Sequence, residues 1–384
     1  MKSIHPVNVL YVNGGPMDFG GITSYMINYY RHFERSKVHI DFIVHGMEKG
    51  PREQEVLDLG SKVYHVPVKS RDYFGNIHGL RNIFRTGKYS IVHAHMDAMN
   101  GLVLKEAKKC GIPIRISHSH NTQYLTTNKF KLALDEIARK NIPKYATHLF
   151  ACSEPAGRWL YGDRLFNEGK VGIIHNAIDV AHFSFNEKIR KAKRKELGID
   201  DQFVIGHVGR FDYQKNHEFL LNAFAELLKI KSDAVLVLVG DGHLRPAIQH
   251  QIKNLGIQDQ VRLLGQRNDV AQLLSAFDLF VFPSRFEGLG SVLVEAQASG
   301  LNCLASDAVP GEVNINQSCD FFSLLKGSSN WAQKMKVMSE IKGSRLINRN
   351  TFVVKGYEID NEASQLEKMY INLSENLILH NISW

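Results

Sequence analysis

Apolar residues along this chain gather in short runs, and amphipathic stretches with helical spacing lie between the runs. Short apolar runs bounded by polar turns are typical of strands that are buried on both faces. The alternation therefore predicts βαβ units, and hence an α/β protein with doubly wound parallel sheets. The predicted strands cover residues 7–13, 38–44, 62–67, 90–95, 113–120, 147–153, 171–176, 203–209, 234–240, 261–265, 279–284 and 302–306.

A polar segment divides this pattern into two halves. Residues 183–200 are rich in Lys and Arg and precede a new strand, which predicts a linker with a short basic helix. The predicted domains are residues 1–182 and 201–365, and residues 366–384 are predicted to form a helix that returns toward the first domain. Ligands of doubly wound sheets bind beyond the carboxyl ends of the strands, so the cleft between the two sheets is the expected site.

Composition places the chain among globular proteins, with 384 residues of which 44% are apolar and 22% are charged. No apolar stretch approaches the ~20 residues needed to cross a bilayer, and the first residues lack the apolar core of a signal peptide. The four cysteines, which suit a reducing compartment because they have no CxxC spacing, are Cys110, Cys152, Cys303 and Cys319. We therefore expect a cytoplasmic protein.

The excess positive charge lies entirely in the first half of the chain. Residues 1–182 contain 24 Lys and Arg against 16 Asp and Glu, whereas the remaining residues contain 23 of each kind. A basic half is typical of proteins with an anionic partner such as a phosphate or an anionic lipid, although a solvated basic surface explains it equally well. No signature of a nucleic-acid-binding module is present, so no nucleic-acid partner is expected.

The segment 282–296, with the sequence FPSRFEGLGSVLVEA, predicts a strand, a glycine-bearing turn and a helix. Gly288 and Gly290 allow a ligand to approach the backbone, and the N-terminus of the helix offers free N–H groups to a phosphate or a sugar. Glu287 and Glu295 are placed to hold hydroxyl groups by charge-assisted hydrogen bonds. The alternative is that Glu287 caps the helix and that Glu295 makes a surface ion pair.

This segment resembles the E-x7-E signature of the retaining GT-B glycosyltransferases of glycosyltransferase family 4. Further segments that fall in the family's order are HNAID at 175–179, VGRFDYQKN at 208–216, VGDG at 239–242 and LGQRNDV at 264–270. Ala177 stands where the family usually has Gly. The resemblance spans nearly the whole chain, is more specific in the second half, and implies two Rossmann-like domains that face each other across a cleft.

The resemblance also implies roles for individual residues. Arg210 and Lys215 would neutralise the donor diphosphate and stabilise the charge that grows on it as the glycosidic bond breaks, so neither a cofactor nor a metal is expected. Glu287 would contact the donor sugar, and Glu295 would hold the ribose. The other residues expected to bind the donor are Arg267, Gly288, Leu289 and Gly290. Solvated surface charges remain the alternative for Arg210 and Lys215.

A glycine-rich loop at residues 13–23 joins the first strand to a helix. It resembles the family's loop that closes over the donor phosphates, and Gly15 and Gly21 are the preferred candidates for that contact. A glycine-rich loop is weak evidence by itself, and a flexible surface turn is the alternative.

Two pairs of histidines alternate along predicted strands: His93 with His95, and His118 with His120. Such pairs are also used as zinc ligands, but that interpretation requires further ligands on later strands, and no later histidine falls in a ligand pattern. We therefore predict no metal site. The resemblance implies a histidine that reaches the donor sugar, with His120 preferred over His118, and a core histidine is the alternative for one of them.

The acceptor is indicated only by resemblance and charge. The strings EVNI at 312–315 and SHSHN at 117–121 look like the branch of the family that builds bacterial capsular or exopolysaccharide. The expected reaction is retaining transfer from a UDP-sugar to a saccharide or a polyprenyl-diphosphate-linked acceptor, with peripheral membrane association through the basic half. The alternatives are a UDP-sugar epimerase of the same fold and a non-catalytic sugar-nucleotide-binding subunit.

Overall fold

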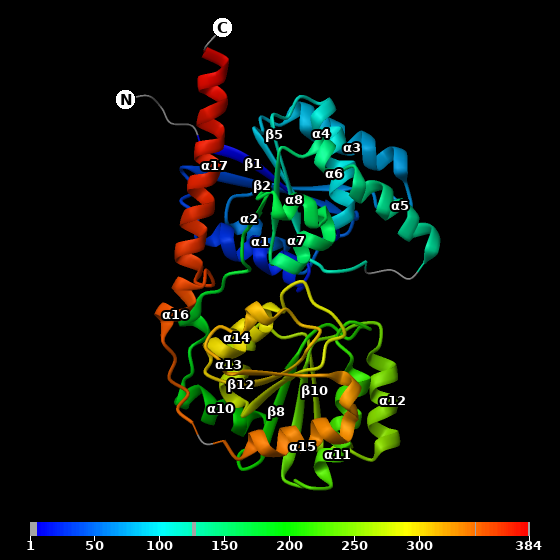
Figure 1. Ribbon diagram of the computed structural model, residues 1–384, viewed down its shortest axis with the longest axis vertical. Coiled ribbons are helices and arrows are strands. Elements are labelled where there is room, and N and C mark those ends of the chain that lie inside the picture. The colour runs from blue at the N-terminus through cyan, green and yellow to red at the C-terminus, as the bar shows by residue number, and fades with distance from the viewer. Residues whose placement is uncertain (1–5, 125–127, 342, 383–384) are drawn as a thin grey trace. The chain divides into compact units, whose positions relative to one another are not determined.

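The computed structural model describes residues 6–124, 128–341 and 343–382 and divides the chain into two compact units (Figure 1). The first unit is Met1–Ala177 together with Ile359–Trp384, and the second unit is Ile178–Glu358. Residues 1–5 of the predicted first domain and residues 383–384 of the predicted last helix lie outside the described residues. Among the described residues, no helix combines the length and the apolarity that crossing a membrane requires.

The first unit contains a seven-stranded parallel sheet with the order β3-β2-β1-β4-β5-β6-β7. Its strands are β1 (Val7–Asn13), β2 (Val38–His45), β3 (Val63–Val66), β4 (Ile91–His95), β5 (Ile114–Ser119), β6 (His148–Ala151) and β7 (Val171–Ile173). All seven strands were predicted from the apolar runs, because a strand covered on both faces has few polar positions.

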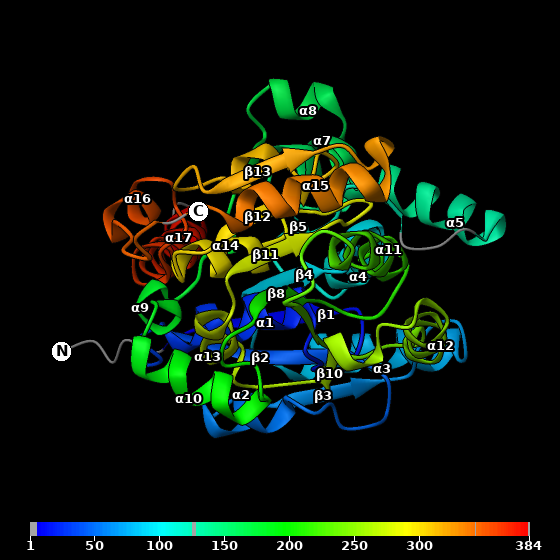
Figure 2. The same cartoon turned by 90° about the horizontal axis from the view of Figure 1, so that it is seen from below.

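The second unit contains a six-stranded parallel sheet with the order β10-β9-β8-β11-β12-β13, and Figure 2 shows β13, β12, β11 and β8 following one another in this order. The strands are β8 (Phe203–Val208), β9 (Ala234–Val239), β10 (Val261–Gly265), β11 (Leu279–Phe282), β12 (Asn302–Ser306) and β13 (Cys319–Phe322). Only β13 was not predicted. It has four residues and includes the exposed Asp320, so its apolar run is too short to stand out in the sequence.

Helices cover both sheets. Those of the first unit are α1 (Gly21–Arg31), α2 (Glu53–Asp58), α3 (Tyr73–Thr86), α4 (Asn100–Lys109), α5 (Lys129–Lys140), α6 (Ile142–Tyr145), α7 (Glu154–Tyr161), α8 (Asp163–Asn167) and α17 (Ile359–Ile382). Those of the second unit are α9 (Val180–Phe183), α10 (Glu187–Leu197), α11 (His217–Leu228), α12 (Arg245–Leu255), α13 (Val270–Ala276), α14 (Ser291–Ala298), α15 (Gly327–Ser339) and α16 (Arg349–Val354). Short 3₁₀ turns are formed by Asp97–Met99, Gln258–Gln260, Gly311–Val313 and Leu324–Lys326.

Successive residues of β1 supply two separate cores, one on each face of the first sheet. Val9 and Tyr11 lie in the core that α1 and α17 cover, whereas Leu10 and Val12 lie in the core that α3 and α4 cover. Both cores consist of fully buried side chains, as the alternation of side chains along a strand requires. This confirms, for the first unit, the doubly wound arrangement that the sequence predicts.

The C-terminal helix α17 belongs to the first unit. Ile359, Ala363, Leu366 and Tyr370 recur at helical spacing and are buried in the core beside α1. The chain therefore returns to the first unit at residue 359, whereas the sequence places the beginning of the returning segment at residue 366.

The basic segment before β8 forms α10 and is fixed to the second unit. Asn186 caps the helix by accepting hydrogen bonds from the backbone N–H groups of Lys188 and Ile189 at 2.9 and 3.1 Å. Arg190 and Arg194 both form ion pairs with Asp278, immediately before β11. The segment predicted as a linker is therefore part of the second unit, which begins at residue 178.

Candidate active site

Two loops of the second unit meet where β8 and β11 end. The two strands are neighbours in the sheet, since Leu279 lies opposite Ile205, so the loops that follow them leave the same edge. The backbone N–H of Arg285 donates to the carbonyl of Gln214 at 2.8 Å, and Asn216 Nδ2 donates to the carbonyl of Pro283 at 3.1 Å. These bonds hold the predicted clamp and the predicted sugar-binding turn together at the carboxyl edge of the sheet.

The clamp residue Lys215 and the turn residue Glu287 form a direct ion pair. Lys215 Nζ lies 2.6 Å from Glu287 Oε1, and the side chains are only 16% and 7% exposed. The other carboxylate oxygen of Glu287 accepts a hydrogen bond of 3.1 Å from Gln214 Nε2. Lys215 Nζ also lies 4.7 Å from the centroid of the Phe282 ring, a distance at which cation and ring attract each other. Both charges are thus shielded from water and fixed in orientation.

Helix α14 begins directly beside this pair. Gly290 is the N-cap residue and has a φ of 88°, a left-handed conformation that favours glycine. As a glycine, it offers no side chain to accept a hydrogen bond from the first turn of the helix. The first turn of α14 contains no acidic residue, so its N-terminus keeps the positive end of the helix dipole. Gly288 and Leu289 are buried in the turn, and Glu295 is half-buried on the helix. Whatever its part at the helix N-terminus, Glu287 is also bonded to Lys215 and Gln214.

Arg210 and Arg267, the two other predicted donor contacts of the second unit, differ in exposure and in ion pairing. Arg210 is exposed and directly follows Gly209 after β8. Arg267 is held by Asp269 through two hydrogen bonds of 2.7 Å, and this ion pair raises the pKa of the Arg267 guanidinium and lowers the pKa of the Asp269 carboxyl. Lys193 of α10 lies 2.7 Å from the same carboxylate. Arg267 therefore has a structural partner, and its contact with a donor stays a prediction.

The glycine-rich loop of the first unit lies between β1 and α1. Gly15 and Gly21 have ordinary backbone conformations, and a Cβ atom added to either residue would meet nothing within 4 Å. Asp18 braces the loop by accepting hydrogen bonds from Gly20 N at 2.8 Å and from Thr23 Oγ1 at 3.2 Å. The local structure thus does not itself require glycine at positions 15 and 21, and their contact with donor phosphates stays a prediction.

The histidines singled out by the sequence come together in the first unit. His93 and His95 lie on β4, His118 lies on β5, and His120 follows β5 directly. His118 is fully buried, whereas His120 is 7% exposed and shares a hydrogen bond of 2.9 Å with His95 Nδ1. Burial lowers the pKa of His120 to about 3, so its imidazole is neutral at physiological pH. Of the two candidates for the donor contact, His120 is the less buried.

Two further residues orient these groups. Gln214 fixes the carboxylate of Glu287, and nothing in the spacing of the motif distinguishes it from a surface glutamine. Asp97, with a φ of 50°, accepts hydrogen bonds from the backbone N–H of His120 at 2.7 Å and from Asn121 Nδ2 at 2.6 Å. An acidic residue just after a predicted strand was the available signal for Asp97.

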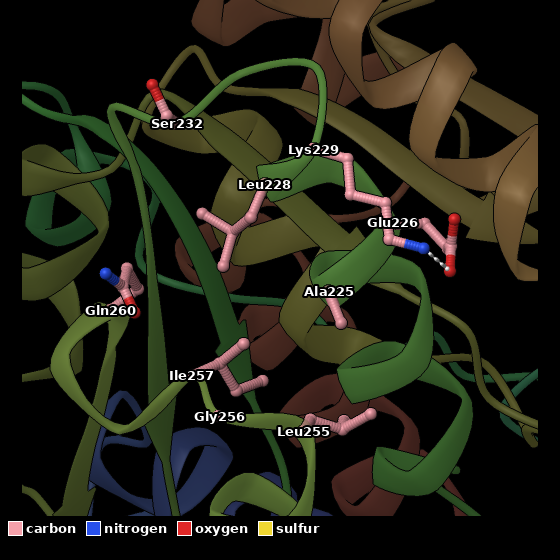
Figure 3. Close-up of a pocket in the computed structure, with 9 residues that line it drawn as sticks. All are labelled: Ala225, Glu226, Leu228, Lys229, Ser232, Leu255, Gly256, Ile257 and Gln260. Atoms are coloured by element: carbon pink, nitrogen blue, oxygen red, sulfur yellow. Dashed lines mark hydrogen bonds and ion pairs between the residues drawn. The ribbon is translucent and has the colours of Figure 1, made fainter.

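A hollow of about 470 Å³ lies elsewhere in the second unit (Figure 3). It is lined by the last residues of α11 and α12, and these helix ends lie near the amino ends of β9 and β10. Its lining is divided evenly between polar and apolar groups, and an ion pair joins Lys229 to Glu226 at 2.7 Å. Because ligands of such sheets bind at the carboxyl edge, this hollow is not a candidate for the donor site.

Similar proteins identify the family. A profile described as "Glycosyltransferase Family 4" matches residues 19–182, and one described as "Glycosyl transferases group 1" matches residues 189–326. The putative glycosyltransferase EpsF of Bacillus subtilis is 34% identical over 94% of this chain and 96% of its own length. The UDP-Gal:alpha-D-GlcNAc-diphosphoundecaprenol alpha-1,3-galactosyltransferase of Escherichia coli is 24% identical over 98% of this chain and 100% of its own.

Solved structures show the same fold. Anabaena HepE, crystallised with UDP and glucose, is 18% identical and matches with a TM-score of 0.70 over 98% of this chain and 99% of its own. Sucrose-phosphate synthase from Thermosynechococcus elongatus is 18% identical and matches with a TM-score of 0.76 over 96% of this chain and 99% of its own. This chain therefore belongs to glycosyltransferase family 4 and is a glycosyltransferase with the GT-B fold of two Rossmann-like domains, as the resemblance predicted.

Proposed function

We propose that this glycosyltransferase transfers a sugar from a UDP-sugar to a polyprenyl-diphosphate-linked saccharide during the synthesis of a bacterial capsule or exopolysaccharide. The observation that carries the proposal is the shielded pair of Lys215 and Glu287 beside the N-terminus of α14. The name of the Escherichia coli relative gives a UDP-Gal donor and a diphosphoundecaprenol acceptor for that protein, and HepE was crystallised with UDP and glucose. Both support the same classes of substrate here.

The cations of the second unit would act on the leaving diphosphate. Lys215 and Arg210 follow β8 at the carboxyl edge, where the backbone N–H groups at the start of α14 also lie. As the glycosidic bond breaks, negative charge grows on the diphosphate, and fixed positive groups stabilise that charge more than they stabilise the bound donor. With these groups in place, the transfer step uses neither a metal nor a cofactor.

The carboxylates would act on the sugar and on the ribose. Glu287 is held in orientation at both oxygens, by Lys215 and by Gln214, and it contacts the donor sugar when the diphosphate takes over Lys215 as its partner. Glu295 binds the ribose hydroxyls from its position on α14. His120 serves as a neutral hydrogen-bond partner of the donor sugar, because burial lowers its pKa far below physiological pH. Attack and departure on the same face of the sugar give retention of configuration.

The first unit would meet the acceptor at an anionic membrane surface. The first unit, residues 1–177 with 359–384, contains 25 Lys and Arg against 19 Asp and Glu, a net charge of +6. The aromatic rings of Tyr73 and Phe74 are 50% and 83% exposed at the start of α3, close in sequence to Lys69 and Arg71. Exposed aromatic residues beside basic ones bind the interface of anionic bilayers, which supports peripheral association.

Donor panels test the proposal directly. Purified protein is incubated with UDP-, GDP- and TDP-sugars, with and without a synthetic polyprenyl-diphosphate saccharide, and nucleotide release is measured. We expect release from one UDP-sugar, acceleration by the acceptor, no requirement for added Mg²⁺ or Mn²⁺, and a product with the donor's anomeric configuration. Interconversion of UDP-GlcNAc without an acceptor would indicate an epimerase. Tight UDP-sugar binding with no release from any donor would indicate a non-catalytic subunit.

A further inference from the structure

Four histidines of the first unit face one another from two adjacent strands. β4 and β5 pair in parallel with His93 opposite Ile116, so alternate residues of both strands point to the face that α1 and α17 cover. The ring centroids of His93 and His95 are 4.2 Å apart, and each of these rings is 5.3 Å from the ring of His118. His93, His95 and His118 are fully buried.

Several ring nitrogens of this cluster have no partner. His93 Nδ1 shares a hydrogen bond of 2.6 Å with Tyr370 OH, and His95 Nδ1 shares one of 2.9 Å with His120 Nε2. Within the described residues, Nε2 of His93 and Nε2 of His95 make no hydrogen bond, and the ring of His118 has only the backbone of Ile174 as a weak partner. A buried polar atom without a partner costs about 1–3 kcal/mol, so a group of such ring nitrogens at one place points to a ligand.

The positions of these nitrogens suit a small cation with nitrogen ligands. One ring nitrogen from each of His93, His95 and His118 lies within 4.8 Å of the other two. Zinc binds imidazole nitrogen at about 2.0–2.1 Å, so the nitrogens of a tetrahedral site lie about 3.4 Å from one another. Ring rotations that shorten the nitrogen–nitrogen distances by about 1.4 Å would therefore form the site. Imidazole favours Zn²⁺, Co²⁺, Ni²⁺ and Cu²⁺, whereas Mg²⁺ and Ca²⁺ prefer oxygen ligands.

Two of the three histidines also have the outer partners that metal ligands usually have. A ligating histidine normally makes a hydrogen bond through its second ring nitrogen, which fixes the ring orientation. Tyr370 OH does this for His93 and in turn lies 2.9 Å from Tyr11 OH, while His120 does this for His95.

We propose that His93, His95 and His118 bind one divalent transition metal of the Zn²⁺ class inside the first unit, with water in the fourth position. The metal would link β4 to β5. Through the hydrogen bond of His93 to Tyr370, it would also stabilise the packing of α17 on the sheet of the first unit. His120, which the proposed function places at the donor sugar, is the hydrogen-bond partner of the ligand His95, so the metal site adjoins that predicted contact while the metal itself takes no part in the transfer step. The sequence-based prediction of no metal site assumed that ligands must come from later strands, whereas two neighbouring strands supply all three.

Metal analysis of the full-length protein tests this site without any variant. The chain is purified after removal of any polyhistidine tag, and its metal content is measured by inductively coupled plasma mass spectrometry. We expect about one zinc per chain. After removal of that zinc with a chelator, we expect saturation by one equivalent of Co²⁺ with a visible d–d band and a higher Tm with Zn²⁺ than without it. Absence of both bound zinc and the Co²⁺ band would overturn the proposal.

Variants then assign the ligands. His93→Asn and His95→Asn should lose the stoichiometric metal, whereas His45→Asn should retain it. His45 is the matched control because it is a buried histidine of the same unit, bonded through Nδ1 to the Asn13 carbonyl at 2.8 Å. Tyr370→Phe should weaken Zn²⁺ binding by about 10- to 100-fold, the usual effect of removing an outer partner. If a folded His93→Asn/His95→Asn double variant keeps its full metal content, these residues are not the ligands. If the variants fail to fold, the Co²⁺ titration of the unaltered chain decides whether the site exists.

Discussion

The two units share one architecture but differ in the polar groups at the carboxyl edges of their sheets. In the second unit, the loops after β8 and β11 carry opposite charges, which meet in the pair of Lys215 and Glu287. In the first unit, the ends of β4 and β5 carry neutral imidazoles, which are buried and lack some of their hydrogen-bond partners. Paired charges at a sheet edge suit a charged substrate that binds and leaves, because the substrate can replace one charge of the pair as the partner of the other. Buried imidazoles without hydrogen-bond partners suit a permanently bound ligand such as a metal ion.

The same comparison explains why one fold can carry both sites. The position of a ligand is set by the strand order and by the edge at which the strands end, and these are alike in both units. The chemistry is set by a few side chains on the loops. Function therefore follows the loops rather than the fold, and changes to those side chains separate the two units experimentally.

The largest effect is expected from the charged pair. Glu287→Gln and Lys215→Met should each lower kcat by about 10²- to 10³-fold, because each removes a fixed group that stabilises charge in the transition state. Nucleotide release measures this effect. Lys336→Met is the control, since Lys336 forms an exposed pair with Glu340 on α15.

A double variant separates catalysis from stability at this pair. Removing one partner leaves the other charge buried and lowers stability, whereas Lys215→Met/Glu287→Gln leaves no uncompensated charge. The double variant should therefore recover thermal stability but not activity. Recovery of both thermal stability and activity would mean that the pair of Lys215 and Glu287 has only a structural role. The second unit would then carry no charged catalytic pair to contrast with the histidines of the first unit.

The next effect concerns pH and the second unit's own buried histidines. Burial lowers the pKa of His207 to about 4 and that of His217 to about 2, and Lys215 nearby adds to both shifts. The unfolded chain therefore binds more protons below pH 6.5, so the free energy of unfolding falls as pH decreases from 6.5 toward these values. At pH 5.5 each histidine should contribute a loss of about 1.4 kcal/mol relative to neutral pH.

Hydrogen exchange of peptides from β8 and α11 at pH 7.5 and 5.5 measures this loss in the second unit alone. His217→Phe removes one titrating group, so its loss of protection should be smaller by about 1.4 kcal/mol than that of the unaltered chain. An equal pH dependence in both proteins would show that His217 titrates normally in the folded state.

A smaller effect should come from the central strand of the second sheet. Gly206 lies on β8, and a Cβ atom there would come within 1.9 Å of the Phe277 ring, whereas the central strand of the first unit has no glycine. Gly206→Ala should lower the free energy of unfolding of the second unit by about 2 kcal/mol or more, because overpacking strains the core. Gly311→Ala, where a Cβ atom meets nothing within 4 Å, should change stability by less than about 0.5 kcal/mol in urea unfolding.

The smallest effect is expected at the cap of α10. Asn186→Ala removes the side chain that accepts from two backbone N–H groups and should destabilise the second unit by about 1 kcal/mol. Lys188→Ala in the same helix turn should have no measurable effect, since Lys188 is exposed. Equal Tm values for the two variants would show that α10 does not contribute to the stability of the unit.

Some parts of the molecule were predictable from local pattern, and others were not. The apolar runs predicted every strand except β13, a four-residue strand that includes the exposed Asp320, and they predicted the other edge strands β3, β7 and β10. The motif around Glu287 predicted a strand, a turn and a helix, which the structure confirms with β11 and α14. The partnership of Glu287 with Lys215 was not predictable, since 72 residues separate them and only sheet pairing brings their loops together.

The layered α/β architecture, the family and the residue types on each functional loop could be inferred from the amino-acid sequence, because these depend on local periodicity and short motifs. The tertiary structure decided which of those residues meet. The order of strands placed β4 beside β5 and β8 beside β11, and so turned two separate histidine pairs into one buried cluster and two distant charges into one ion pair. The physical reason is that burial and pairing depend on distances across the sheet, which spacing along the chain does not record.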